Sequence, residues 1–113
     1  MLNRVASRYL RIWIDLTATE DGGRTTPLDL SSEWPVVYQP RLRVRGGCGA
    51  LLPVEFVAGP PDPVRPGSGA FATIRLPDPP DSAHGELAAD VEFDLIEGAR
   101  IVGHGRVVGR QGI

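Results

Sequence analysis

The 113-residue chain contains no lysine, because all twelve of its basic residues are arginines. This absence excludes lysine chemistry, both a Schiff base and the phosphate-binding lysine of a nucleotide loop. The chain has one cysteine, Cys48, so no disulfide can form within it. Aromatic residues are scarce at 6%, and the net charge of -2 gives no overall attraction to nucleic acid or to an anionic membrane.

Long hydrophobic runs are also absent from the sequence. No run approaches the roughly 20 apolar residues that a membrane helix needs. The first 16 residues lack the continuous apolar stretch and the small-residue cleavage site of a signal peptide. We therefore expect a cytoplasmic location and no membrane association. The length is that of one domain, so we expect residues 1–113 to form a single domain whose core spans about 8–108.

Glycine and proline, in contrast, are abundant, with 14 and 11 residues. Such a high content of glycine and proline is typical of many short strands joined by turns. Apolar and polar residues alternate in several short runs, which is the period of a half-buried strand, and no stretch of ten or more residues has a helical period. Six short strands predict an all-β barrel or sandwich. The predicted strands are 9–16, 36–45, 50–58, 70–76, 91–95 and 101–108.

The last two predicted strands form the clearest local unit. The four residues EGAR (97–100) separate them, and so short a connection indicates an antiparallel hairpin. Gly103 and Gly105 fall on one face of the second strand. Glycine at such positions marks a sharp bend, or a place where another backbone comes close.

Four segments, in their order along the chain, resemble the C-terminal β-barrel domain of elongation factor Tu. They match that domain's acidic-Gly-Gly-Arg turn, its Tyr-x-Pro strand, its Pro-Gly segment with the strand that follows, and its terminal hairpin. The resemblance spans about residues 8–108 and implies a single six-stranded antiparallel barrel. The segments are EDGGRTTPL (20–28), YQPRLRVR (38–45), VRPGSGAFATIRLPDP (64–79) and FDLIEGARIVGHGRVV (93–108).

In that family the barrel contacts the T-stem of aminoacyl-tRNA, the nucleotide-exchange factor and the factor's own GTPase domain. A chain without lysine has no phosphate loop, so we expect no GTP binding. Of the family's tRNA-contact positions, the glycine of the terminal turn is kept as Gly98, beside Arg100. Arg41 stands where the family has a glutamine, and the family's threonine of the following turn falls near Ala50. Asp78 replaces a histidine, and its carboxylate would repel phosphate.

Arg41, Arg43 and Arg45 alternate along one predicted strand and therefore share a face. They would lie about 6.6–6.8 Å apart, close to the phosphate spacing of one nucleic-acid strand, which suggests a phosphate-tracking stripe. The alternative is a solvated face that discourages strand-edge aggregation. Acidic residues could neutralise such a stripe across the barrel; they are Asp78, Asp81, Glu86, Asp90, Glu92, Asp94 and Glu97.

Four aromatic residues are candidates for a partner-binding patch: Tyr9, Trp13, Trp34 and Tyr38. Tyr9 and Trp13 lie opposite the apolar face of the first predicted strand, and exposed aromatics are enriched at protein interfaces. The alternative is that a loop folds over them.

We find no catalytic or metal-binding constellation. The two histidines, His84 and His104, have no metal-ligand spacing with each other or with Cys48. A triad of Ser68, His104 and Asp94 can be drawn, but no nucleophile elbow supports it. We therefore expect a non-enzymatic binding module without a cofactor that engages a protein, possibly of the translation machinery. The alternative is a tRNA-binding or RNA-binding protein that uses the arginine stripe.

Overall fold

The first strand shows how the alternating sequence produces the sheet. The computed structural model describes residues 8–31 and 38–110. In β1 (Tyr9–Leu16) the apolar positions are buried and Arg11, between them, is exposed. An extended chain points successive side chains to opposite faces, so one face of β1 enters the core while the other stays outside. The buried residues of β1 are Leu10, Ile12, Ile14 and Leu16.

Within these described residues, seven strands and two short 3-10 helices are present, and all strand pairs are antiparallel. The prediction of an all-β fold is confirmed. The remaining strands are β2 (Arg41–Val44), β3 (Leu52–Pro53), β4 (Glu55–Ala58), β5 (Gly69–Arg75), β6 (Glu92–Glu97) and β7 (Arg100–Arg110). The 3-10 helices are η1 (Thr19–Asp21) and η2 (Ser82–Glu86).

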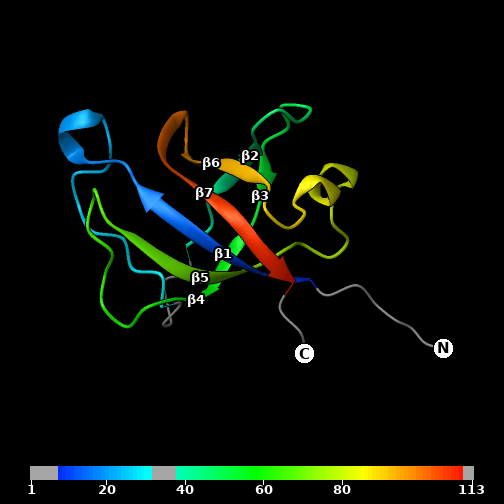
Figure 1. Ribbon diagram of the computed structural model, residues 1–113, viewed down its shortest axis with the longest axis horizontal. Coiled ribbons are helices and arrows are strands. Elements are labelled where there is room, and N and C mark those ends of the chain that lie inside the picture. Colours follow the sequence, from blue (N-terminus) through cyan, green and yellow to red (C-terminus); the bar gives the residue numbers. More distant parts are fainter. Residues whose placement is uncertain (1–7, 32–37, 111–113) are drawn as a thin grey trace.

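The strands form one curled sheet in the order β3-β2-β6-β7-β1-β5-β4 (Figure 1). β1 lies between β7 and β5, and the three strands run side by side across the molecule. β3 and β4 lie at the two edges of the sheet although only Val54 separates them in the chain.

The predicted six-stranded closed barrel is therefore wrong in two respects: the sheet has seven strands, and it is an open half-barrel. The predicted strand 50–58 is divided, because its first part pairs with β2 and its second part with β5. Pro53 and Pro40 lie where the two edges meet, and proline has no N–H to donate to a ladder. In the described residues, backbone bonds reach the segment before β2 from Val54 N–H, to the Pro40 carbonyl at 3.3 Å, and from Phe56 N–H, to the Tyr38 carbonyl at 2.9 Å.

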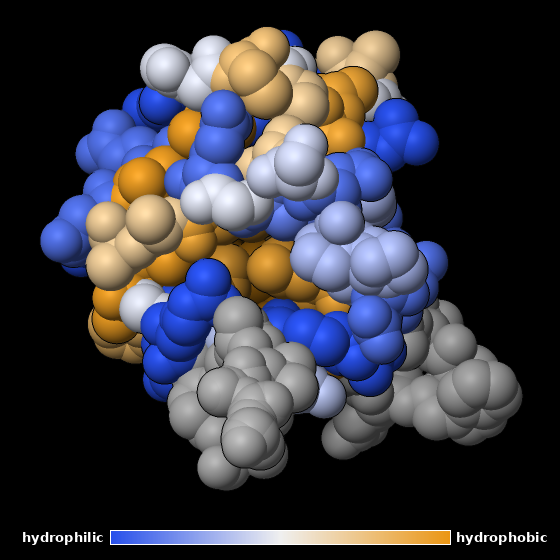
Figure 2. Space-filling view, turned by 90° about the vertical axis from the view of Figure 1, so that its right-hand side faces the viewer, coloured by the Kyte–Doolittle hydropathy of each residue, from blue (hydrophilic) through white to orange (hydrophobic). Residues whose placement is uncertain are grey.

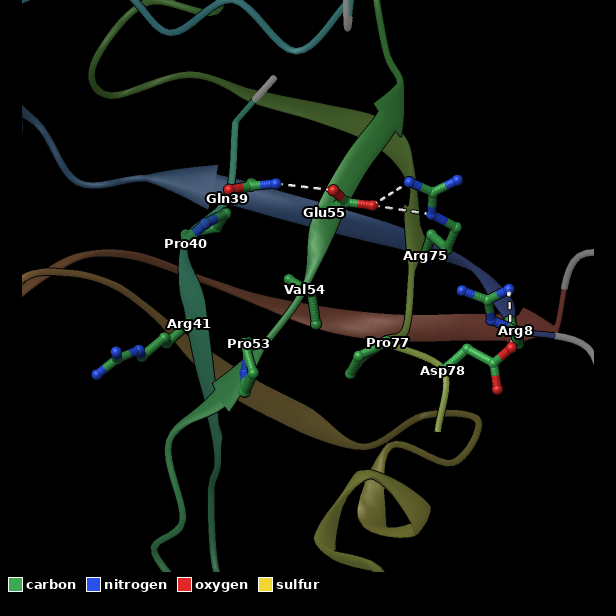
Figure 3. Close-up of a pocket in the computed structure, with 10 residues that line it drawn as sticks. All are labelled: Arg8, Gln39, Pro40, Arg41, Pro53, Val54, Glu55, Arg75, Pro77 and Asp78. Atoms are coloured by element: carbon green, nitrogen blue, oxygen red, sulfur yellow. Dashed lines mark hydrogen bonds and ion pairs between the residues drawn. The ribbon is translucent and has the colours of Figure 1, made fainter. Parts of the chain in front are cut away.

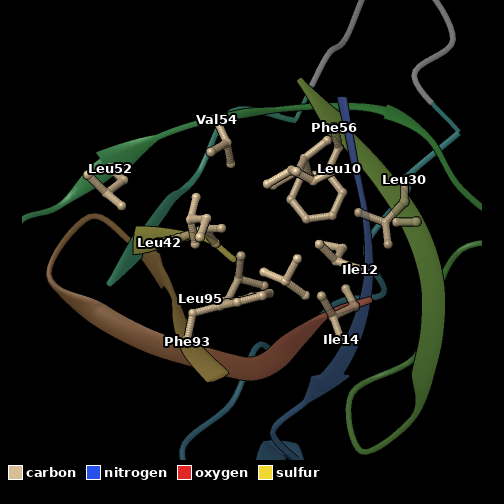
Figure 4. Packing of buried hydrophobic residues seen from close by; sticks show 14 of the residues in the cluster. Leu10, Ile12, Ile14, Leu30, Leu42, Leu52, Val54, Phe56, Phe93 and Leu95 are labelled. Atoms are coloured by element: carbon tan, nitrogen blue, oxygen red, sulfur yellow. The ribbon is translucent and has the colours of Figure 1, made fainter. Parts of the chain in front are cut away.

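The core fills the inside of the curled sheet. Side chains from β1 face those from β6 and from the Leu52–Ala58 segment across the interior (Figure 4). The largest fully buried side chains are Phe56 and Phe93. Leu30, from the loop after η1, adds to the same cluster. The outward positions hold mainly polar residues, together with a few exposed apolar ones such as Phe71 in β5 and Ile101 and Val108 in β7.

The glycines of β7 allow β1 and β7 to approach closely, as the sequence predicts. A Cβ atom on Gly103 would lie 2.6 Å from the Asp15 carbonyl oxygen. A Cβ atom on Gly105 would lie 2.8 Å from Cζ of Phe93, and closer still to the Trp13 carbonyl oxygen. No side chain fits at either position while the strands keep this spacing.

The segment between β5 and β6 contains an element that was not predicted from the sequence, the helix η2. The helix η2 is fixed by His84, which is buried. The Asp81 N–H donates to Nδ1 of His84 at 2.9 Å, so this nitrogen is unprotonated and Nε2 carries the hydrogen. Nε2 then donates to the Pro53 carbonyl at 3.0 Å. His84 therefore ties η2 to β3 and has a structural role.

Candidate functional site

The predicted arginine stripe is present on β2 but is largely paired with acids. Arg43 contacts Asp94 at 3.4 Å, and Arg45 contacts the same carboxylate at 3.0 Å. Arg45 also lies 3.7 Å from Glu92. Both acids belong to β6, which pairs with β2 in register, with Arg43 opposite Asp94. Among the described residues, only Arg41 of the three has no acidic partner.

The other two residues taken from the resemblance are located in the terminal hairpin. Gly98 has a φ of 60° in the two-residue turn between β6 and β7, a conformation that favours glycine. Arg100 donates to the carbonyl oxygens of Gly22 and Gly23, at 2.8 and 3.0 Å. These bonds fasten the hairpin to the turn after η1, so Arg100 has a stabilising role in the fold.

A second polar cluster lies near the same hairpin and was not foreseen. Glu97 accepts a hydrogen bond from the Tyr38 hydroxyl at 2.5 Å and also pairs with Arg24. The Tyr38 ring packs on Phe56, with ring centroids 5.2 Å apart. Tyr38 thus belongs to the fold and does not join Trp13 in a surface patch. Trp34, the remaining candidate aromatic, lies outside the described residues.

The environment of Tyr38 predicts a loss of stability in alkali. Burial raises the pKa of Tyr38 above its ordinary value of about 10, and the hydrogen bond to Glu97 acts in the same direction. Folding favours the neutral phenol, so its contribution is complete below pH 10 and is lost as the pH rises further. Between pH 8 and pH 11, we expect wild type to lose more unfolding free energy than Tyr38→Phe, measured by urea denaturation. Equal losses in the two proteins would contradict this assignment.

Trp13 and Phe71 form an exposed aromatic pair on the outside of the sheet. They lie opposite each other on β1 and β5, with ring centroids 4.8 Å apart in an edge-on arrangement. Phe71 is 50% exposed, and the Arg11 guanidinium lies over its ring, 5.4 Å from the centroid. The Trp13 indole donates to Asp15 at 2.9 Å, which fixes its orientation.

A shallow pocket of about 470 Å³ adjoins this pair. Small residues at the end of β4, just after it and in β5 line it together with Arg11 and the two rings; they are Ala58, Gly59, Pro60 and Ala70. We call Arg11, Trp13, Phe71 and these four residues the Trp13 face. Trp13 was predicted from the sequence to belong to a partner-binding patch, and Phe71 was not. The signal was available, because Phe71 alternates with the buried Ala72 and Ile74.

Tyr9, the other aromatic predicted on this strand, lies further along β1. It is opposite Arg75 in the register and forms a side-chain hydrogen bond with it. Arg75 in turn is paired with Glu55, which also accepts a hydrogen bond from Gln39 at 2.7 Å. Tyr9 therefore joins a polar network, and Arg11 separates it from Trp13.

A larger pocket of about 500 Å³ lies beside that network (Figure 3). Its lining includes Pro53 and Glu55 from the two edge strands, and Pro40, which precedes β2. Its charged groups are already paired, Arg75 with Glu55 and Arg8 with Asp78, while Arg41 points away from the others in this view. The end of the molecule where β1 begins is hollowed, with hydrophobic residues on the floor and hydrophilic ones around the rim (Figure 2).

The register of β6 and β7 places Asp94 opposite His104, but among the described residues no hydrogen bond or ion pair joins Ser68, His104 and Asp94 into the triad drawn from the sequence. His104 lies 3.9 Å from Asp15, and Asp94 is bound to Arg43 and Arg45. Among the described residues, no group of three or more His, Cys, Asp or Glu side chains is placed to hold a metal ion. In the same part of the chain, no helix is long and apolar enough to cross a membrane.

Comparison with known proteins finds no family model and no curated protein that matches the chain.

Proposed function

We propose that this protein is a non-enzymatic binding module that engages a protein partner through the Trp13 face. One observation carries the proposal: Trp13 and Phe71 are held together on the outside of the sheet with half of Phe71 exposed. Exposed aromatic clusters with an arginine are enriched at protein interfaces, where a few such residues supply most of the binding energy. The polar contacts of Arg11 and Asp15 orient the pair in advance.

The resemblance to the C-terminal barrel of elongation factor Tu extends this proposal. It rests on the four segments in their order, and it makes a cytoplasmic component of the translation machinery the first partner to test. The half-barrel is then a modified version of that domain, with the departure located at Pro40 and Pro53. No GTP and no cofactor take part in binding of this kind.

The test is a capture experiment with three versions of the purified chain: wild type, Phe71→Ser and Leu51→Ser. Leu51 is the matched control because it is a large apolar residue, 42% exposed, outside the Trp13 face. We expect one or more proteins from an extract of the source cells to bind wild type and Leu51→Ser and to be lost with Phe71→Ser. Thermal unfolding checks that both variants remain folded. Identical captured sets for all three versions would overturn the proposal.

RNA binding through the stripe is the second candidate, and Arg41, which has no acidic partner in the described part of the chain, favours it. If all three stripe arginines neutralised phosphates, log K would fall against log salt with a slope near -2.7 and affinity would drop roughly 40-fold between 50 and 200 mM salt. Because acids hold Arg43 and Arg45, we expect a slope no steeper than about -0.9, which corresponds to at most about a 3.5-fold drop in affinity over the same salt range. Titration of tRNA at the two salt concentrations, followed by fluorescence anisotropy, distinguishes these results.

A further inference from the structure

Positive charge is concentrated on the strands that carry the Trp13 face. The charged residues of β1, β5 and β7 are five arginines and one aspartate, although the whole chain has a net charge of -2. β6, in contrast, contains three acids and no base. The five arginines are Arg11, Arg75, Arg100, Arg106 and Arg110, and the aspartate is Asp15.

Some of this charge is compensated and some is not. Arg75 and Arg106 have acidic partners in Glu55 and Asp90. The Arg100 guanidinium is bonded to uncharged carbonyl oxygens. Arg11, at the centre of the face, lies over the Phe71 ring and has no acidic partner among the described residues. An arriving group of negative charge therefore meets the Arg11 guanidinium on one side of Trp13, while the Asp15 carboxylate on the other side is bonded to the Trp13 indole and lies 3.9 Å from His104.

The shape of the face favours a peptide over RNA. Single-stranded nucleic acid binds by stacking its bases on free aromatic rings. Here Arg11 lies over the Phe71 ring, and Trp13 meets that ring edge-on. What stays open is the pocket beside Phe71, lined by Ala58, Gly59, Pro60 and Ala70. A pocket lined by small apolar residues can accommodate one bulky side chain of a partner, as the pockets that bind anchor residues at protein interfaces do.

We propose that the partner presents an acidic segment whose central aromatic or large aliphatic side chain enters this pocket, while a flanking carboxylate pairs with Arg11. This inference rests on the proposed function, since it names the chemistry of the partner for the same face. The carboxylate supplies the charge that Arg11 lacks, and the anchor covers the exposed part of Phe71. Charge complementarity of this kind sets specificity and association rate more than it sets affinity.

The test is a selection of random 12-residue peptides displayed on phage against the full-length chain. We expect enriched peptides to have a net negative charge and one recurring aromatic or leucine position. Synthetic copies of these peptides should bind Phe71→Ser at least 30-fold more weakly, the loss typical of an interface anchor. Arg11→Glu should weaken binding at least tenfold at 50 mM salt and less at 500 mM salt.

Arg41→Glu is the matched control, because it makes the same charge change on β2, which β6 and β7 separate from β1. It should alter peptide affinity less than threefold. Enrichment of neutral or basic peptides, or no enrichment, would overturn the acidic-segment inference while the capture experiment still decides the proposed function. Capture that is insensitive to Phe71→Ser would overturn both. Binding of a 12-nucleotide single-stranded RNA that competes with the peptides would replace a protein partner with nucleic acid.

Discussion

Replacing Gly105 with alanine is expected to lower the free energy of unfolding by about 3 kcal/mol, the upper end of the cost of overpacking a core. The added Cβ would lie within 2.8 Å of the Phe93 ring and closer still to the Trp13 carbonyl oxygen. A side chain could move aside, but the carbonyl belongs to the backbone of β1. The strands would have to separate, and the pairing between β1 and β7 would be lost around Ile14.

Gly109→Ala is the control for this prediction. Gly109 lies in the same strand, and a Cβ added there meets no atom within 4 Å. We expect it to change stability by less than about 0.5 kcal/mol, as surface substitutions usually do. Both variants are measured by urea denaturation at neutral pH. A Gly105→Ala protein as stable as Gly109→Ala would contradict the close packing of the two strands.

Adding Phe93→Leu to Gly105→Ala should not restore stability, because the clash with the Trp13 carbonyl remains.

Replacing Phe93 with alanine is expected to cost about 3–5 kcal/mol, the range for removing a buried phenylalanine side chain. Phe93 is fully buried and belongs to the central cluster between β1 and β6. Its loss would leave a cavity that the surrounding strands cannot fill, because their hydrogen-bonded ladders fix their spacing. We expect the substitution to leave the chain unfolded or with a melting temperature at least about 12 °C lower, since 1 kcal/mol corresponds to roughly 4–8 °C in a domain of this size.

Phe71→Ala makes the identical chemical change at the exposed position and is the control for Phe93→Ala. It removes only the contacts with Trp13 and Arg11, so we expect a loss of at most about 1.5 kcal/mol, the value of an aromatic pair. Thermal unfolding followed by circular dichroism compares the two. Similar melting temperatures for both variants would mean that the core and the Trp13 face are wrongly assigned.

The strands themselves could be predicted because their alternation is local. β1, β5 and β7 coincide with the predicted strands to within two residues at each end. The division at Val54 could not be predicted, since it depends on which partner strand each half of 50–58 meets. Pro40 and Pro53 indicate in the sequence that strand pairing could be interrupted. That this interruption leaves the sheet open follows only from the folded arrangement of the two segments.

The candidate site was less predictable than the fold, because it depends on pairing across strands. The spacing of Arg41, Arg43 and Arg45 was read correctly as a shared face. Their neutralisation depends on the register that places Arg43 opposite Asp94, and no local pattern encodes that register. Neutralisation by acidic residues was one of the sequence alternatives, and Glu92 and Asp94 supply it for Arg43 and Arg45.

Phe71 illustrates the opposite case, in which local information was sufficient. Its outward position follows from the alternation of β5, just as that of Trp13 follows from the alternation of β1. Only the register between the strands, however, brings the two rings together. The two outward aromatic residues therefore form one surface. The candidate binding surface lies on β1 and β5, and not on the arginine stripe of β2.

The most direct test of the Trp13 face is the dissociation constant between the captured partner and each of three chains, measured by isothermal titration calorimetry. With wild type as the reference, we predict at least a 30-fold weakening for Phe71→Ser, as for a side chain at the centre of an interface. For Leu51→Ser we predict less than a threefold change, because Leu51 lies outside the face. A partner that binds Phe71→Ser as tightly as wild type, or that is weakened equally by both substitutions, would contradict the assignment of the binding surface.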